Sequence, residues 1–474
     1  MKTNKTVVKI LAVALASIMA FSAFSATLFT ASAASVLAEG LCGDNVKWAL
    51  DSDGILTVSG TGDMYDIASG PLFPETNSSP WNKYVQAVRT VVIDTGVTGI
   101  GDYTFCFCKN LYRLLIADTV KTIGDHAFEG CDVLTDASIA PGSRLKTIGT
   151  YAFKGCSSMS EFDIPEGVTE IGDFAFYFSG VEYLLIPKTV KTIGTGALAA
   201  CGALKGNMGY IGACKAIVAA DDSPYFKSED GALYTKDMSV LIAVPTAVEE
   251  RFAVPDSVSK IVYGAFSVCT KLYEISMTDS VLVIENGTFG YCTNLRKIKL
   301  PYHITKIDDN MFKGCENLQE ITFSKSVKTI GVNAFDGCVK LGKVYYEGDR
   351  NDKANIVFGG NNQSLLDAEW IYETVIRHVI NVNIKDFPKT RYRYGQAFNK
   401  SGMTIEVTYS DGTTVPVTDP NAIRVSGYNS KIPGIQPLSV TYDGFTITMN
   451  VTVLTIFLSV LDFLFGWIFR IFKK

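Results

Sequence analysis

The chain has 474 residues, a formal net charge of −5, 47% hydrophobic residues and 19% charged residues. This ordinary globular balance excludes an intrinsically disordered chain, and the length allows several domains. The negative charge argues against nucleic acid as a partner, because binding to phosphates needs an excess of lysine and arginine.

Residues 1–33 have the pattern of a secretory signal peptide. Three lysines precede a long apolar run, and Ala31-Ser32-Ala33 then supplies a cleavage site of the Ala-x-Ala type. Loss of these three lysines changes the formal charge from −5 to −8. We therefore expect an exported protein, and we exclude residues 1–33 from the predicted fold.

Residues 34–89 combine short strand-like runs with turn signals such as Asp53-Gly54 and Pro80-Trp81. The residues after this segment repeat, and a stack of repeats needs its first unit covered. We assign residues 34–89 as an N-terminal β-rich cap. For the same reason we assign residues 348–374, with Trp370 and Tyr372, as a C-terminal cap or linker.

Nearly the same phrase occurs nine times between Ile100 and Leu341: Ile, four residues, an aromatic residue, two residues, Cys, two residues, Leu. One unit departs from it with Leu198 at the aromatic position, and another departs with Ser179 at the Cys position. The anchoring isoleucines are Ile100, Ile123, Ile148, Ile171, Ile193, Ile261, Ile284, Ile307 and Ile330. Their steps are 22 to 25 residues, except for one of 68, which predicts two degenerate units between Leu204 and Val258. Alternating pairs such as Ile321 and Phe323 indicate a short half-buried strand in each unit.

One unit cannot bury its own Ile, Phe, Cys and Leu, so neighbouring units must stack on each other. We predict a slightly curved repeat solenoid over residues 90–347, with a period of about 23 residues. Each coil is predicted to hold a short β-strand and a tight helical turn. The recurrent Asp or Thr two residues after the isoleucine, as in Asp125, Thr150 and Asp309, is predicted to cap that turn.

These units resemble the BspA-like leucine-rich repeats of bacterial surface proteins. The resemblance rests on runs such as Val-Lys-Thr-Ile-Gly-Asp-His-Ala-Phe-Glu-Gly-Cys at 120–131 and Val-Lys-Thr-Ile-Gly-Val-Asn-Ala-Phe-Asp-Gly-Cys at 327–338. It covers about half of the chain. It implies an exported adhesion or binding protein without catalytic residues, and it does not say what is bound.

Eight of the eleven cysteines occupy one position of the repeat. Neighbours in this column lie about one coil apart, ~4.8 Å, which is wider than a disulfide allows. We predict a buried, reduced ladder in which Cys serves as a small hydrophobe. Cys42, Cys106 and Cys214 lie outside the column, and a disulfide involving one of them stays open.

A second column carries rings three residues after the isoleucine in the first four units, where later units carry Gly or Asn. The rings are Tyr103, His126, Tyr151 and Phe174. If this position faces outward, stacking aligns them into a strip able to bind a sugar face or a partner side chain. The alternative is that the rings only cover the neighbouring coil. We name these four residues, the aromatic strip, as candidate ligand-binding residues.

The sequence lacks the common catalytic and metal-binding patterns. Its three histidines lie in separate segments, and it has no His-Glu-x-x-His, Gly-x-Ser-x-Gly or phosphate-loop motif. Residues 194–199 fit a loose dinucleotide pattern, but they lie in register with the repeat. We therefore predict no catalytic, cofactor-binding or metal-binding residues, and no enzyme activity.

Residues 375–453 lose the period and alternate strand-like runs with turns such as Ser410-Asp411-Gly412. Hairpins of this length fit a small β-sandwich. The segment resembles the bacterial immunoglobulin-like modules of surface proteins in Tyr394-Gly395-Gln396-Ala397-Phe398 and Tyr409-Ser410-Asp411-Gly412. The resemblance implies a stalk, with ligand binding as the less favoured role.

Residues 454–474 are strongly apolar and aromatic, with a narrow polar stripe at helical spacing. Residues 454–472 would form a helix of ~28 Å, just short of the ~30 Å hydrocarbon core of a membrane. Arg470, Lys473 and Lys474 suit the cytoplasmic side, whereas Asp462 at mid-depth argues against a span. We predict a membrane-anchor helix, with an interfacial helix and a soluble packing helix as alternatives.

Together these features predict an exported protein at the extracellular face of the cell membrane, anchored by residues 454–474. We expect it to bind an extracellular protein or glycan as a non-catalytic adhesion module. Two alternatives stay open. One is a self-associating structural component of the envelope, and the other is an exported cell-wall hydrolase, against which the missing histidine-centred motifs argue.

Overall fold

The computed structural model describes residues 34–67, 78–206, 209–212, 214–372, 379–387, 389–410 and 412–455. The predicted signal peptide lies outside these residues, as do residues 456–474 of the predicted anchor helix. No helix among the described residues is both long enough and apolar enough to cross a membrane.

The first arm of the solenoid is built from two six-stranded sheets, one along each face of the stack. The broader sheet holds β1 (Val36–Leu41), β2 (Val46–Asp51), β3 (Ile55–Gly60), β5 (Thr90–Ile93), β7 (Arg113–Ile116) and β9 (Asp136–Ile139). The other holds β4 (Gly62–Asp63), β6 (Val97–Ile100), β8 (Thr122–Ile123), β10 (Thr147–Ile148), β11 (Glu170–Ile171) and β13 (Thr192–Ile193). From β3 onward successive coils pair in parallel, as stacked repeats require.

The turns of the coils are not helical, which corrects the prediction of a helical turn in each unit. In all nine coils the residues three and seven positions after the anchoring isoleucine have positive φ, as Tyr103 and Phe107 do at 57°. A left-handed residue interrupts a right-handed helix. Some backbone N–H groups of the turn therefore donate to the next coil and others donate within their own coil. Phe105 N donates to Ala127 O of the next coil at 2.8 Å, whereas Cys108 N donates to Phe105 O of its own coil at 3.2 Å.

The recurrent aspartates join coils instead of capping helices. Oδ1 of Asp125 accepts a hydrogen bond from Thr150 N at 2.7 Å, and Oδ1 of Asp309 accepts one from Val332 N at 2.7 Å. In each case the donor belongs to the next coil. The aspartate column thus stabilises the stack, and the predicted cap has no helix to act on.

The core of the stack is a ladder of phenylalanine rings. Phe105, Phe128, Phe153 and Phe176 are fully buried, and successive ring centroids lie 5.3, 5.4 and 5.6 Å apart. Trp81 stacks on the first ring at 5.0 Å and so closes the open end of the ladder. A 3-10 helix, Asn82–Tyr84, follows this tryptophan.

The cysteine column lies beside the phenylalanine ladder, and all eleven cysteines of the chain are buried free thiols. Repeated thiols donate to the carbonyl of the preceding coil, as Cys131 Sγ does to Phe105 O at 3.2 Å and Cys292 Sγ does to Phe266 O at 3.1 Å. Burial raises the pKa of the Cys292 thiol to about 12. The structure agrees with the predicted reduced ladder.

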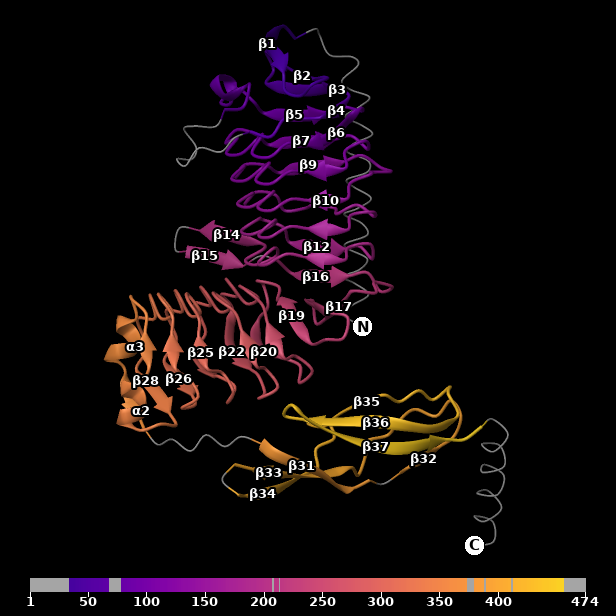
Figure 1. The fold of residues 1–474 in the computed structure, drawn as a ribbon, viewed down its shortest axis with the longest axis vertical. Coiled ribbons are helices and arrows are strands. Elements are labelled where there is room, and N and C mark those ends of the chain that lie inside the picture. Colours follow the sequence, from indigo (N-terminus) through magenta and orange to yellow (C-terminus); the bar gives the residue numbers. More distant parts are fainter. Residues whose placement is uncertain are drawn as a thin grey trace.

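The solenoid turns a corner between its two arms, so the predicted slight curvature is wrong (Figure 1). The 68-residue step from Ile193 to Ile261 holds the hairpin β14 (Ala203–Gly206) and β15 (Gly209–Gly212), then β16 (Ala216–Ala219) and the antiparallel strands β17 (Phe226–Glu229), β18 (Ala232–Thr235) and β19 (Val240–Ala243). Strand β16 pairs with β12 (Tyr183–Ile186), which precedes the step. Antiparallel strands cannot continue a parallel ladder. Two hydrophobic clusters result, and β18 separates them: Leu233 packs in the first and Tyr234 in the second.

The second arm repeats the two-faced coil. One sheet holds β20 (Glu250–Ala253), β22 (Leu272–Ser276), β24 (Lys297–Lys299), β26 (Glu320–Phe323), β28 (Lys343–Tyr346) and β30 (Glu369–Ile371). The opposite face holds β21 (Lys260–Ile261), β23 (Val283–Ile284), β25 (Lys306–Ile307), β27 (Thr329–Ile330) and β29 (Val357–Phe358). Helices α2 (Arg350–Ala354) and α3 (Gln363–Asp367) lie at the far end, where Trp370 packs edge-on against Phe323 and Tyr346.

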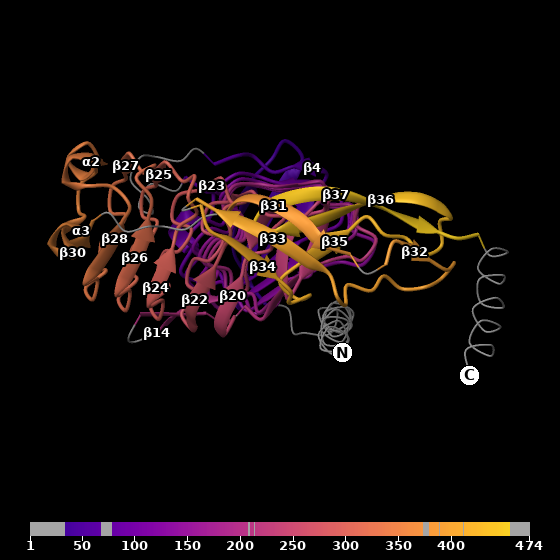
Figure 2. The ribbon, with the colours of Figure 1, turned by 90° about the horizontal axis from the view of Figure 1, so that it is seen from below.

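The last described segment is a separate β domain of two sheets. One sheet holds β31 (Val379–Asp386), β33 (Thr404–Tyr409) and β34 (Thr414–Val417), and the other holds β32 (Arg391–Tyr392), β37 (Phe445–Val453), β36 (Gly434–Tyr442) and β35 (Arg424–Ser426). The domain lies beside the second arm (Figure 2). Arg424 Nη1 donates to Ser257 Oγ at 3.3 Å across this contact.

Candidate functional site

The four residues of the aromatic strip come together as predicted from their spacing. Ring centroids are 4.3 Å apart for Tyr103 and His126, 4.7 Å for His126 and Tyr151, and 5.0 Å for Tyr151 and Phe174. All four rings are half-buried. All four also have positive φ, between 54° and 58°, so each side chain occupies a backbone position that favours Gly or Asn.

A charged group supports the strip from one side. His126 Nδ1 contacts Glu129, and Lys154 Nζ lies 2.9 Å from the other carboxylate oxygen of Glu129. Burial opposes ionisation of Glu129, but the hydrogen bonds from His126 and Lys154 outweigh it and hold the pKa of this carboxyl below its usual value. The Lys154 ammonium also lies 4.6 Å from the centroid of the Tyr151 ring.

The stacked geometry limits what the strip can offer to a ligand. A sugar binds to the open face of a ring, whereas here the faces of inner rings are covered by neighbouring rings. Tyr263 packs edge-on against Phe174 at 5.1 Å, and a Cβ at Gly196 would lie 2.6 Å from Phe174, so the row of rings cannot continue there. The strip therefore presents ring edges, and its binding role stays a prediction.

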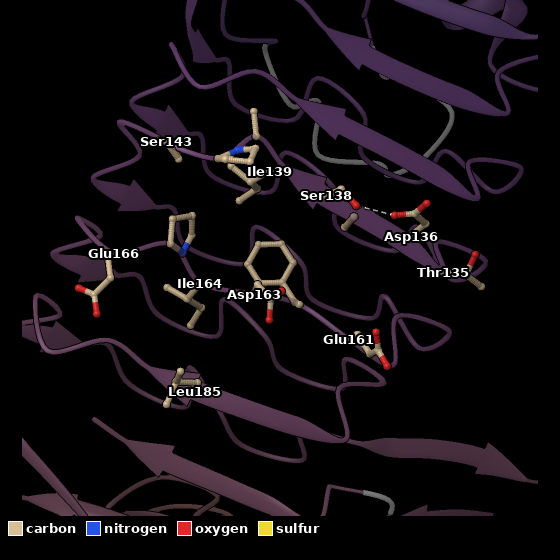
Figure 3. A pocket seen from close by; sticks show the side chains of 16 residues that line it. Thr135, Asp136, Ser138, Ile139, Ser143, Glu161, Asp163, Ile164, Glu166 and Leu185 are labelled. Atoms are coloured by element: carbon tan, nitrogen blue, oxygen red, sulfur yellow. Dashed lines mark hydrogen bonds between the residues drawn. The ribbon is translucent and has the colours of Figure 1, made fainter. Parts of the chain in front are cut away.

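A groove opens on the broader face of the first arm, where the strand ladder is interrupted. It has a volume of about 750 Å³ and is lined by residues 135–143, 161–166 and Leu185. Figure 3 shows Asp136 and Ser138 on β9 along one side, with Glu161, Asp163 and Ile164 on the irregular segment opposite. We call this hollow the strand-face groove.

The groove exists because the coils separate on one face only. On the opposite face β8, β10 and β11 pair in register. On the broader face β9 pairs with β7 alone, and residues 161–164 form only an isolated bridge from Glu161 to Tyr183. The Phe162 ring lies between Phe153 and Phe176, at 4.7 and 5.3 Å, so a bulky residue replaces the small core side chain of Ala137 one coil earlier.

The groove is acidic above an apolar floor. Asp136, Glu161, Asp163 and Glu166 line it, and no lysine or arginine does. Asp136 is already paired, since Arg113 Nε lies 2.9 Å from Oδ2 and Ser138 Oγ donates to Oδ1 at 2.7 Å. Burial, followed by the nearby charges of Asp163 and Glu182, raises the pKa of the Glu161 carboxyl. A cation placed in the groove would relieve this repulsion.

Sequence reasoning missed the groove, although one signal of it was present. The step from Ile123 to Ile148 is 25 residues, and the excess lies in a loop containing Pro141-Gly142 after β9. Proline at 141 and 165 follows the two segments that fail to pair. A longer spacing between anchoring isoleucines indicates an irregular coil, but it does not indicate on which face of the solenoid a groove forms.

The described residues contain no group of three or more His, Cys, Asp or Glu side chains arranged to hold a metal ion. His126, within the aromatic strip, contacts Glu129 and stacks between two rings. The strand-face groove offers carboxylates, backbone groups and apolar surface to a ligand.

Comparison with known proteins gives two family matches. Residues 83–205 and 248–363, together half of the chain, match the BspA type leucine rich repeat region in six copies. Residues 386–453 match the bacterial Ig-like domain of group 3.

Solved structures of bacterial repeat proteins are similar to this chain. A leucine-rich repeat protein from Eubacterium ventriosum is 23% identical, with a TM-score of 0.55, over 72% of this chain and 97% of that chain. A leucine rich cell surface protein from Faecalibacterium prausnitzii is 26% identical, with a TM-score of 0.44, over 69% and 98%. The first of these shows the same fold.

A curated relative is similar over a short stretch. Pectate lyase L from Thermoclostridium stercorarium is 32% identical over 78 residues, which are 16% of this chain and 6% of that enzyme. The match therefore covers only a small part of the enzyme's length.

Proposed function

Because the chain belongs to the BspA-type leucine-rich repeat family, we propose that it is an exported, non-catalytic binding and adhesion protein of the bacterial cell surface. Its ligand is an extracellular protein or glycan. The solenoid binds this ligand, the β domain acts as an immunoglobulin-like stalk, and residues 454–474 anchor the chain at the extracellular face of the membrane.

The observation that carries the proposal is the strand-face groove. Two arms of stacked coils present a long outer surface, and on it one hollow of about 750 Å³ combines carboxylates, an unpaired strand edge and exposed apolar side chains such as Leu185. Binding sites commonly have this mixture of apolar surface and a few placed polar groups. The groove lies between coils and runs beside β9, which suits recognition of an extended partner.

An array of extracellular-matrix proteins and bacterial or host glycans tests this function. The full chain, purified in a mild non-ionic detergent, is labelled and applied to the array, and its mass is measured by light scattering. We expect selective binding by a monomer and no cleavage of polygalacturonate or cell-wall glycan. Absence of selective binding together with self-association, or hydrolysis of any polymer, would contradict the proposal.

A further inference from the structure

We infer that the strand-face groove binds an extended, lysine- or arginine-bearing segment of a partner protein, which pairs as an added strand with the open edge of β9. This inference rests on the proposed function and specifies its ligand. The occupant is a peptide, and a glycan in the same groove is an outcome of the test that would contradict it.

The backbone of β9 provides the first argument. In a parallel sheet, alternate residues direct their N–H and C=O groups to opposite neighbours. Asp136 N and Ala140 N donate to Tyr112 O and Ile116 O, at 3.1 and 2.8 Å, on the β7 side. The N–H and C=O groups of Ala137 and Ile139 therefore point away from β7, toward the groove, where no described strand pairs with β9.

An unpaired strand edge is a template for another strand, and peptide recognition by strand addition uses such edges. The four residues of β9 span about 13 Å at ~3.3 Å per residue, so the occupant pairs over about four to six residues. Elsewhere in the first arm the equivalent edges of β3, β5 and β7 are covered by the next coil. The opening is thus specific to the coil that follows β9.

Charge provides the second argument and selects the occupant. The carboxylates of Glu161 and Glu166 make no hydrogen bond or ion pair with any described residue, and they line the same hollow as Asp136 and Asp163. Alternate side chains of an added strand point to the same face. A segment with a basic residue at every second position can therefore place its cations against these carboxylates, while the apolar residues between them face Phe162 and Ile164.

The experiment measures binding of a fluorescent peptide, Ac-Lys-Val-Lys-Val-Lys-Val-NH2, to the full chain by anisotropy. The double variant Glu161→Gln, Glu166→Gln removes the two unpaired charges, and we expect it to weaken binding about tenfold. The matched control is Glu316→Gln, Glu369→Gln, which removes two exposed carboxylates of the second arm and should leave the affinity unchanged.

The strand pairing is tested separately. Ala137→Pro removes an N–H that faces the groove without removing a bond to β7, and proline is tolerated at such an edge. We expect this variant to weaken binding about tenfold or more with an unchanged melting temperature. Should the variant fold poorly, two peptides make the same test from the ligand side, one N-methylated at its valines and one at its lysines. The amides that face β9 belong to the valines of an antiparallel added strand and to the lysines of a parallel one, so one of the two peptides should lose binding although both keep their charges.

Three results would overturn the inference: absence of binding, equally tight binding of the acidic peptide Ac-Glu-Val-Glu-Val-Glu-Val-NH2, or an affinity of the Glu161→Gln, Glu166→Gln and Ala137→Pro proteins equal to that of the native chain. Failure here differs from failure of the proposed function. If array ligands still bind equally to the Glu161→Gln, Glu166→Gln protein, the chain is a binding protein that uses another surface. If a glycan competes in the groove and no peptide binds, the groove is a site of a different class.

Discussion

Backbone conformation, more than ligand contact, determines which residue types occur in the turns. The position three residues after each anchoring isoleucine has positive φ in all nine coils, which explains the Gly and Asn of the later coils. An ordinary side chain there costs about 1–2 kcal/mol. In the first four coils this cost is offset by ring stacking, which contributes about 0.5–1.5 kcal/mol per pair.

Tyr151 allows this balance to be measured, because its φ is 58° and it stacks on both sides. At most positions Gly destabilises a protein relative to Ala. Here we expect the free energy of unfolding, measured by denaturant titration, to be about 1 kcal/mol higher for Tyr151→Gly than for Tyr151→Ala. Both variants should be less stable than the native chain. A lower stability of the Gly variant would show that backbone strain does not govern this column.

The cysteine column gives a second prediction at the residue scale. All eleven thiols are buried. Burial raises the pKa of seven of the eight thiols in the repeat column, as at Cys108 and Cys292 to about 12, whereas a hydrogen bond with Cys214 lowers the pKa of Cys201. Since the thiolate is the reactive form, Ellman's reagent at pH 8 should label none of the eleven within minutes in the native chain and all of them in 6 M guanidinium. Fast native labelling, or fewer than eleven thiols after denaturation, would indicate exposure or a disulfide.

Among the elements, β18 has the least usual position, because its two faces belong to different cores. Leu233 packs in the cluster of the first arm and Tyr234 in the cluster of the second. We expect Leu233→Ala and Tyr234→Ala each to cost about 2–5 kcal/mol. Hydrogen exchange should increase mainly in β12 and β16 for the first variant and in β20 and β22 for the second. An equal increase in both arms would show that the arms unfold as one unit.

The coils were predictable from the sequence because stacking imposes one environment on each repeated position. Ile123, Phe128 and Cys131 are each buried as the period requires. The helical turn was wrong because an isoleucine-based period does not report φ, and the left-handed residues appear in the sequence only as a tendency toward Gly and Asn. Aspartate before a turn predicted a cap, yet Asp125 bonds to the next coil.

The corner and the strand-face groove could not be predicted, for a related reason. A 68-residue step equals about three periods, so two degenerate parallel coils and an antiparallel insert such as β17–β19 have the same length. Likewise, the 25-residue step before Ile148 marks an irregular coil, but the opening depends on how Phe162 packs between Phe153 and Phe176. Both features depend on packing between segments that no local pattern encodes.

At the scale of the whole molecule, the β domain meets the second arm across an acidic contact. Asp256, Asp279, Asp443, His303 and Arg424 line the cleft between them. Burial raises the pKa of Asp256 and Asp443 above the usual value. The docked form therefore binds protons more tightly than a separated form, and docking should strengthen as pH falls and weaken as pH rises through these raised pKa values.

Small-angle scattering of the full chain in detergent-matched buffer measures this effect. We expect a smaller radius of gyration at pH 5 than at pH 7.5. Asp443→Asn keeps a residue type that tolerates the positive φ of this position, 47°, and removes one titrating group, so it should reduce the pH dependence. The opposite trend, a more extended molecule at pH 5, would show that the buried carboxylates do not control the contact.

The measurement that tests the central claim most directly is a hydrogen-exchange footprint of the full chain with and without a saturating ligand identified on the array. Binding in the strand-face groove predicts slower exchange at amides in 137–143 and 161–166, with amides near Tyr103, Tyr151 and the β domain unchanged. Protection confined to the aromatic strip or to the β domain, with no change at 137–143 and 161–166, would contradict it.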